Sequence, residues 1–226
     1  MSEWTKPNDP DGPAIVHPLE ELREETGTYG KYWTGNRDIT DYSDKQKQNA
    51  VYLWAWGKAK GYTLEAISGM AGNMTRESHI DPGRWQKVSS GMTKRKQGYG
   101  LVQWTPYWKY GDWCEAQNLY PPKYDSALAR IEYEIANNEQ WIPTKTYNLT
   151  FTEYLHTSDQ TIEWMAKAFF YNYERGSDAS TRVKPAQYWY EYLGGVTPPS
   201  PGVTTLPVWL LKKCVDNQRR GRGIFY

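Results

Sequence analysis

Apolar residues recur at helical spacing through most of the middle of this chain. The clearest case is a stretch in which four apolar side chains follow one another at intervals of three and four residues: Leu64, Ile67, Ala71 and Met74. This spacing builds one apolar helix face. Thr63 stands where an N-cap belongs, and Pro82 requires the helix to end soon after residue 78. The same pattern predicts further helices at residues 45–60, 106–117, 125–139, 150–156, 159–174 and 180–193.

Cap and breaker residues set the ends of several of these helices. Asp44 is predicted to cap the first helix, and Gly61 to end it. Ser158 or Asp159 is predicted to cap the helix at 159–174, and Gly194 to stop the last one. The fold class we expect is therefore mainly α, as a single domain over residues 44–195.

The two flanks of this domain lack such periodicity. Residues 1–43 are rich in Pro, Gly, Asp and Thr, which predicts an irregular N-terminal extension. Residues 196–226 begin with a Pro-rich linker and contain one short apolar patch, at 208–211. Both extensions carry large rings, which suit docking onto a partner: Trp4, Trp33, Trp209, Phe225 and Tyr226.

Composition excludes several classes of protein. The 27 basic and 26 acidic residues nearly cancel, so no overall field favours nucleic acid. We see no apolar run long enough for a membrane span and no N-terminal signal segment. The two Cys and three His show no metal-ligand spacing, so we expect no metal or other cofactor. The 12 Trp and 19 Tyr suit sugar stacking and protein interfaces.

Glu77 is the first candidate for chemistry, because it follows Met74 by three residues at the edge of the apolar face. A carboxyl half in apolar surroundings should have a raised pKa and keep a proton near neutral pH, as a general acid must. The simpler interpretation is a solvated residue at a helix end. Another alternative is a buried partner of Arg76 or Arg84.

Three short motifs follow in order and favour the catalytic interpretation: Glu77-Ser78, Gly100-Leu101-Val102-Gln103 and Tyr171-Asn172-Tyr173. This ordered set resembles the lysozyme-like superfamily of goose-type lysozymes and soluble lytic transglycosylases. The longer stretches 69–74, 81–86, 98–106 and 188–193 resemble the phage tail lysozyme family more closely, over about residues 44–195. The resemblance implies a lysozyme-like fold and a peptidoglycan glycosidase carried in a virion tail.

By this resemblance, Glu77 is the general acid. The substrate-binding residues are then expected to be Ser78, Tyr99, Gln103, Trp104, Asn172 and Tyr173. Tyr99 and Trp104 are expected to stack on sugar faces. Asn172 and a neighbouring tyrosine, Tyr171 or Tyr173, are expected to orient the substrate or the acid.

A second carboxylate stays open between Asp81 and Glu174. An Asp before a Pro is often a turn residue. Glu174 is slightly better explained as a structural partner of Arg175 or Arg182. If neither carboxylate takes part, the N-acetyl or 6-hydroxyl group of the substrate could act instead, as in lytic transglycosylases. The product would then be an anhydro sugar.

The function we expect is a muramidase or lytic transglycosylase that acts on the bond between N-acetylmuramic acid and N-acetylglucosamine. It would be made in the host cytoplasm, carried in a phage tail tip or knob, and open the wall locally for genome delivery. The expected partners are peptidoglycan and other tail proteins, the latter through the extensions, without nucleic acid. The alternatives are a structural tail component that only binds glycan and a free endolysin. Retention of Glu77, Gln103 and Asn172 favours activity.

Overall fold

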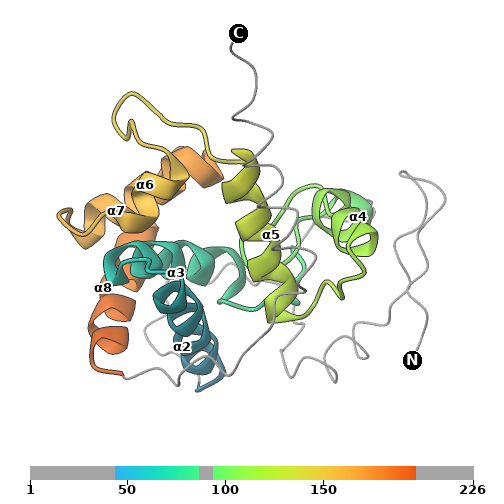
Figure 1. Cartoon of the computed structure of the whole chain (residues 1–226), viewed down its shortest axis with the longest axis horizontal. Helices are drawn as coiled ribbons and strands as arrows, with labels where there is room; N and C mark the ends of the chain where they lie inside the picture. The colour runs from blue at the N-terminus through green and yellow to red at the C-terminus, as the bar shows by residue number, and fades with distance from the viewer. Residues whose placement is uncertain (1–43, 87–93, 197–226) are drawn as a thin grey trace, which may run out of the picture.

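The computed structural model describes residues 44–86 and 94–196, and the chain in these ranges is helical without strands (Figure 1). The fold is mainly α, as predicted. The described elements, in order, are α2 (Asp44–Ala59), α3 (Leu64–Ser78), the short 3-10 helix η1 (Lys94–Lys96), α4 (Trp108–Ala116), α5 (Tyr124–Asn137), α6 (Phe151–His156), α7 (Ile162–Phe169), the π-helical turn η2 (Phe170–Glu174) and α8 (Ser180–Gly194).

Helix α3 is the centre of the bundle. It packs against α2, α6, α7 and α8, while α4 and α5 lie to one side of this group (Figure 1). Twelve of its fifteen residues are buried, so the helix is covered on nearly all sides and not only along the predicted apolar face. Its buried polar side chains bond to the surrounding helices. The Asn73 side-chain amide donates to the Ala166 carbonyl at 3.0 Å, and Thr75 Oγ1 accepts from Trp189 Nε1 at 2.7 Å.

Small residues let α3 and α8 approach closely. A Cβ added at Gly72 would lie 2.6 Å from Ala186 Cβ and 2.8 Å from Ala186 Cα, which is too close for two packed carbons. The contacts between residues 77 and 182 and between residues 65 and 190 show that the two helices run antiparallel. The first turn of α8 is thereby held against the C-terminal end of α3.

The predicted positions of the helices are confirmed, and α7 differs from its prediction in its start, its cap and its end. The observed ends of the other predicted helices lie within two residues of the expected ones, and Thr63 caps α3 by accepting from Ala66 N at 3.2 Å. The predicted cap of α7 at Ser158 or Asp159 is wrong. Thr161 takes that role and accepts from Trp164 N at 3.1 Å, because the helix starts only at Ile162 and Thr161 has the extended backbone of an N-cap residue.

The stretch predicted as one helix at 159–174 also changes form before its end. The α-helix ends at Phe169 and the chain continues as the π-helical turn η2. Such turns are rare and occur often at functional sites. The two predicted extensions, 1–43 and 196–226, lie outside the described residues except for residue 196.

Candidate active site

Glu77 lies in the last turn of α3, with its side chain 21% exposed. Its Oε1 accepts a hydrogen bond from Arg182 Nη2, in the first turn of α8, at 2.5 Å. Burial raises the pKa of Glu77 above its usual value, and the opposing effects of the Arg182 and Arg76 cations are smaller. The carboxyl therefore holds its proton to a higher pH than an exposed glutamate.

A polar cavity of 630 Å³ opens at Glu77. Two walls enclose it, one from the chain between α3 and α4 and one from the chain that joins η2 to α8. The first wall carries Gln86, Val102, Gln103, Trp104, Thr105 and Lys109, and the second carries Phe170, Tyr173, Glu174, Arg175, Gly176, Ser177, Asp178, Thr181 and Arg182. Hydrogen-bonding side chains on both walls suit a sugar chain, whose surface is largely hydroxyl and amide.

Glu174 faces the same cavity, from the end of η2. Burial and the nearby charge of Glu77 raise the pKa of Glu174 well above its usual range. Its Oε1 is buried without a hydrogen-bond partner. The expected structural pairing with Arg182 is not what the structure shows, because the guanidinium of Arg182 bonds to Glu77 and stacks over the Phe170 ring at 4.8 Å.

Asp81, the other candidate for a second carboxylate, lies in a turn. Its side chain is buried, and its Oδ1 accepts from Gly83 N at 2.8 Å. It is not among the residues that line the cavity. The structure thus agrees with a turn role for Asp81, and Glu174 is the one of these two candidates that shares the cavity with Glu77.

Two of the residues expected to bind substrate shape the cavity wall through protein contacts. The Ser78 hydroxyl donates to the Leu101 carbonyl at 2.8 Å and so fastens the end of α3 to the first wall. Gln103 adopts a left-handed backbone with φ of 52°. Its Nε2 donates to the carbonyls of Arg84 and Gly100, each at 3.0 Å, while the residue lines the cavity.

The two rings expected to stack on sugars are both core residues. Tyr99 is 1% exposed and packs edge-on against Trp85 and Tyr107. Trp104 is 4% exposed and stacks on Tyr110, with 4.3 Å between ring centroids. Trp104 reaches the cavity as part of its wall, and Tyr99 does not. In this structure neither ring presents a face for a sugar.

Asn172 and Tyr173 leave η2 in different directions. Asn172 is fully buried, where its Nδ2 donates to the Tyr147 carbonyl at 2.8 Å and its Oδ1 accepts from Thr144 N at 2.9 Å. Contrary to our expectation, its side chain holds the loop before α6 and is not at the cavity. Tyr173 lines the cavity and is the tyrosine that joins the site, whereas Tyr171 stacks on Tyr147 with 5.7 Å between centroids.

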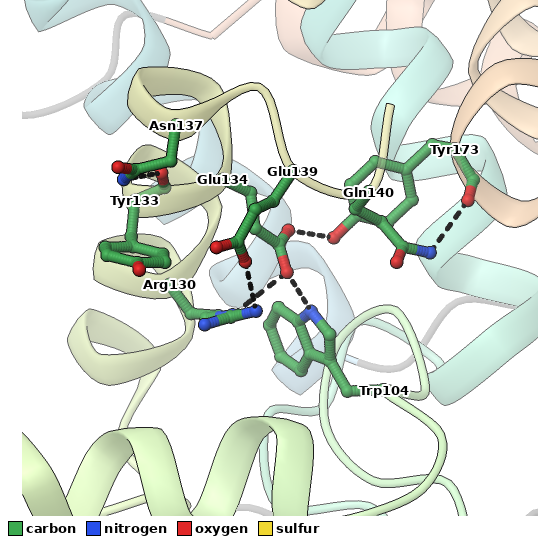
Figure 2. Close-up of polar contacts among 8 residues, drawn as sticks. All are labelled: Trp104, Arg130, Tyr133, Glu134, Asn137, Glu139, Gln140 and Tyr173. Atoms are coloured by element: carbon green, nitrogen blue, oxygen red, sulfur yellow. Dashed lines mark hydrogen bonds and ion pairs between the residues drawn. The ribbon is translucent and has the colours of Figure 1, made fainter. Parts of the chain in front are cut away.

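The sequence analysis missed Glu134, a buried carboxylate that ties together three elements of the fold (Figure 2). Its side chain is 1% exposed and accepts from Trp104 Nε1 at 2.9 Å, from Arg130 Nε at 3.0 Å and from the Tyr173 hydroxyl at 2.5 Å. The sequence held one signal for it. Glu134 follows Ile131 by three residues at the end of an apolar helix face, the same relation that Glu77 has to Met74.

Gln140 completes this part of the site from the loop after α5. Its Nε2 donates to the Tyr173 carbonyl at 3.0 Å, and the residue lines the cavity (Figure 2). Tyr173 is therefore held at both ends, by its hydroxyl and by its carbonyl. Trp104 and Tyr173, one from each wall, meet at the single carboxylate of Glu134. The distance between the walls is set by this shared acceptor.

The contrast between Asn172 and Gln103 gives the first prediction. Asn172→Ala leaves the Thr144 amide and the Tyr147 carbonyl without their buried partner, so the free energy of unfolding should fall by about 1–3 kcal/mol. Urea denaturation of the purified variant measures this. Gln103→Ala is the matched amide deletion at the half-buried cavity wall, and we expect a smaller loss of stability but a larger loss of activity per folded molecule. The reverse order of stabilities would show that Asn172 does not hold the loop.

A helical domain with a half-buried glutamic acid at the end of its central helix, beside a polar cavity, has the architecture of a lysozyme-like protein. Comparison with known families supports this class, because residues 48–193 match the phage tail lysozyme family. The chain belongs to that family. Membership implies an activity of the glycosidase or lytic transglycosylase type.

One curated relative comes from a phage. The chain is 41% identical to morphogenesis protein 1 of Bacillus phage B103 over 149 aligned residues. The aligned stretch makes up 65% of this chain and 40% of that protein. The chain thus spans about two fifths of the length of this relative. Together the two comparisons identify a phage lysozyme-like protein.

No helix in the described residues is long and apolar enough to cross a membrane. Residues 44–86 and 94–196 also hold no group of three or more His, Cys, Asp or Glu that could bind a metal ion. The described cysteine, Cys114, is a buried free thiol with a pKa raised by burial.

Proposed function

We propose that this protein is a virion tail-associated glycosidase that cleaves the bond between N-acetylmuramic acid and N-acetylglucosamine in peptidoglycan. Its role is to open the bacterial wall locally while the phage delivers its genome. The observation that carries the proposal is Glu77, a carboxyl with a raised pKa at the mouth of a polar cavity. A glycan-binding protein without activity would not need a protonated carboxyl there.

Glu77 protonates the leaving oxygen of the glycosidic bond in this proposal. The bond from Arg182 holds the Glu77 side chain in one orientation, facing the cavity. After the proton has left, the same guanidinium stabilises the carboxylate that remains. The deprotonated acid can then accept a proton from the group that attacks the sugar.

Glu174 is unsuited to act as a charged second carboxylate. Burial is the main cause that raises the pKa of Glu174 well above its usual range, so this carboxyl is poorly suited to supply a nucleophile or a negative charge to an oxocarbenium-like centre. We therefore propose that the N-acetyl or 6-hydroxyl group of the substrate supplies the second reacting group.

The tail location rests on the family and on the phage relative. Docking of the two extensions onto other tail proteins remains part of the proposal. The mechanism as proposed needs no cofactor, since each step uses a side chain of the cavity or a group of the substrate.

Mass spectrometry of peptidoglycan fragments tests the proposed activity. The protein should release disaccharide-peptides from purified walls, with anhydro-muramic ends if the 6-hydroxyl group attacks and with free reducing ends if water does. A digest that contains neither product, from folded protein that still binds walls, would favour the glycan-binding alternative. Products cut only at amide bonds would contradict a glycosidase.

A further inference from the structure

The cavity holds an excess of positive charge that the reaction does not use. Four cations line it, Arg76, Lys109, Arg175 and Arg182, against the three carboxyls of Glu77, Glu174 and Asp178. The whole chain carries a formal charge of only +1, so this excess is local. Glu174 adds little negative charge, since its pKa is raised well above the usual range.

Two of the four cations form no ion pair with a carboxylate in the part of the chain that the structure describes. Arg182 bonds to Glu77, and Asp178 caps the start of α8 by accepting from Ser180 N at 2.8 Å. Lys109 and Arg175 are exposed, and within residues 44–86 and 94–196 neither side chain makes a hydrogen bond or an ion pair. Their neighbours in the cavity are mainly amides and hydroxyls.

Lys109 and Arg175 belong to the two different walls of the cavity, and each has a backbone amide held by a hydrogen bond. Lys109 belongs to the first turn of α4, where its amide donates to the Pro106 carbonyl at 3.0 Å. Arg175 has a left-handed backbone with φ of 57°, and its amide donates to the Phe170 carbonyl at 2.8 Å. Arg175 directly follows Glu174 in the second wall, and Lys109 belongs to the first wall.

We propose that Lys109 and Arg175 form an anion subsite, which takes a carboxylate carried on the lactyl substituent of muramic acid. This inference rests on the proposed function, because the substrate must contain muramic acid. The lactyl group branches from the sugar ring and either continues into a peptide with free carboxylates or ends in its own carboxylate. Such a branch must leave the cavity past its walls, where the two cations stand. The subsite would thus distinguish peptidoglycan from uncharged glycans of the same backbone.

Three substrates separate the sources of the carboxylate. The first is glycan strands with intact peptides, and the second is the same strands after conversion of their carboxyls to methylamides. The third is strands freed of peptide by an amidase, in which only the lactyl carboxylate remains. The initial rate of glycosidic cleavage on each substrate gives kcat/KM.

The test variant is Lys109→Gln with Arg175→Gln. Its ratio of kcat/KM on intact strands to that on methylamide strands should fall by about threefold to tenfold relative to the wild type, mainly through KM, as expected for two partly exposed ion pairs. The control carries Lys58→Gln with Lys184→Gln, which removes the same charge at exposed positions that do not line the cavity. The double variant Lys109→Arg with Arg175→Lys keeps both charges, so its ratio of kcat/KM on the two substrates should equal that of the wild type.

Each outcome decides the proposal. A selective loss on intact strands supports it and identifies the peptide carboxylates, and a selective loss on peptide-free strands supports it and identifies the lactyl carboxylate. An equal loss on all three substrates, no loss on any of them, or the same loss in the control would overturn it. A wild type that cleaves none of the three substrates removes the proposed glycosidase function itself, which is a different result from an active wild type with unaffected variants.

Discussion

Replacing Glu77 by Gln should lower the rate of wall lysis by about 10²-fold or more, with the fold intact. Glutamine keeps the size of the side chain and can still accept the hydrogen bond from Arg182, but it cannot deliver a proton. The assay is the turbidity loss of purified peptidoglycan. Glu191→Gln is the matched control, because Glu191 is an exposed residue of α8 that does not line the cavity.

Glu174→Gln separates the roles of the two carboxyls. Because burial raises the pKa of Glu174 and so favours its protonated form, a neutral amide resembles its proposed working state, and this variant should retain much more activity than Glu77→Gln. If the two variants lose activity equally, Glu174 works as a charged group and the proposed part played by the substrate is wrong. If Glu77→Gln lyses walls at the wild-type rate, Glu77 is not the acid.

The pH dependence of lysis follows from the same carboxyl. A general acid works in its protonated form, so the rate should fall as pH rises through the raised pKa of Glu77. Arg182 lowers the pKa of Glu77, and its replacement by Gln should therefore move this fall to higher pH. If the rate of lysis falls at the same pH in the Arg182→Gln variant as in the wild type, the group that titrates is not Glu77.

The largest loss of stability should come from Glu134→Ala. This change leaves the buried Arg130 guanidinium without its main partner and removes the acceptor of both Trp104 and Tyr173. Breaking a buried ion pair on one side costs about 3–5 kcal/mol of unfolding free energy. Urea denaturation followed by tryptophan fluorescence measures the change.

Glu139→Ala is the control for this prediction, because Glu139 pairs with the same guanidinium at 3.0 Å but has a side chain that is 43% exposed. An exposed pair contributes at most about 1 kcal/mol. Similar small losses in both variants would mean that Glu134 is not a structural centre of the domain. A large loss in Glu134→Ala alone would confirm that one carboxylate supports both walls.

The sequence predicted the helices well, because their positions follow from apolar spacing and from caps that act locally. Thr63 and the residues of its helix needed no tertiary information. The change from α7 to the π-helical turn did depend on it, since the apolar positions in residues 162–174 do not mark where the hydrogen-bond pattern changes. The burial of Asn73 and Thr75 was likewise invisible, because their partners come from α7 and α8.

The sequence predicted the candidate site at Glu77, because a titratable side chain at the end of an apolar helix face is visible in the sequence itself. The resemblance carried Gln103 and Tyr173 to the cavity, and the structure places both there. It could not tell that the rings of Tyr99 and Trp104 are turned into the core. Glu134 was missed because two of its donors, Trp104 and Tyr173, are distant from it in sequence. The third donor, Arg130, lies four residues before it, and this spacing is that of an ordinary helical ion pair.

The π-helical turn has a consequence for how this domain can vary. Its last three residues serve three separate purposes: Asn172 holds a loop, Tyr173 reaches Glu134, and Glu174 faces the cavity. Loss or gain of one residue upstream would rotate all three by about 100° around the helix axis and detach them together. The length of this segment should therefore be less tolerant of change than the identity of most of its side chains. A relative with one residue fewer here would need a different way to join its loop, its wall and its acid.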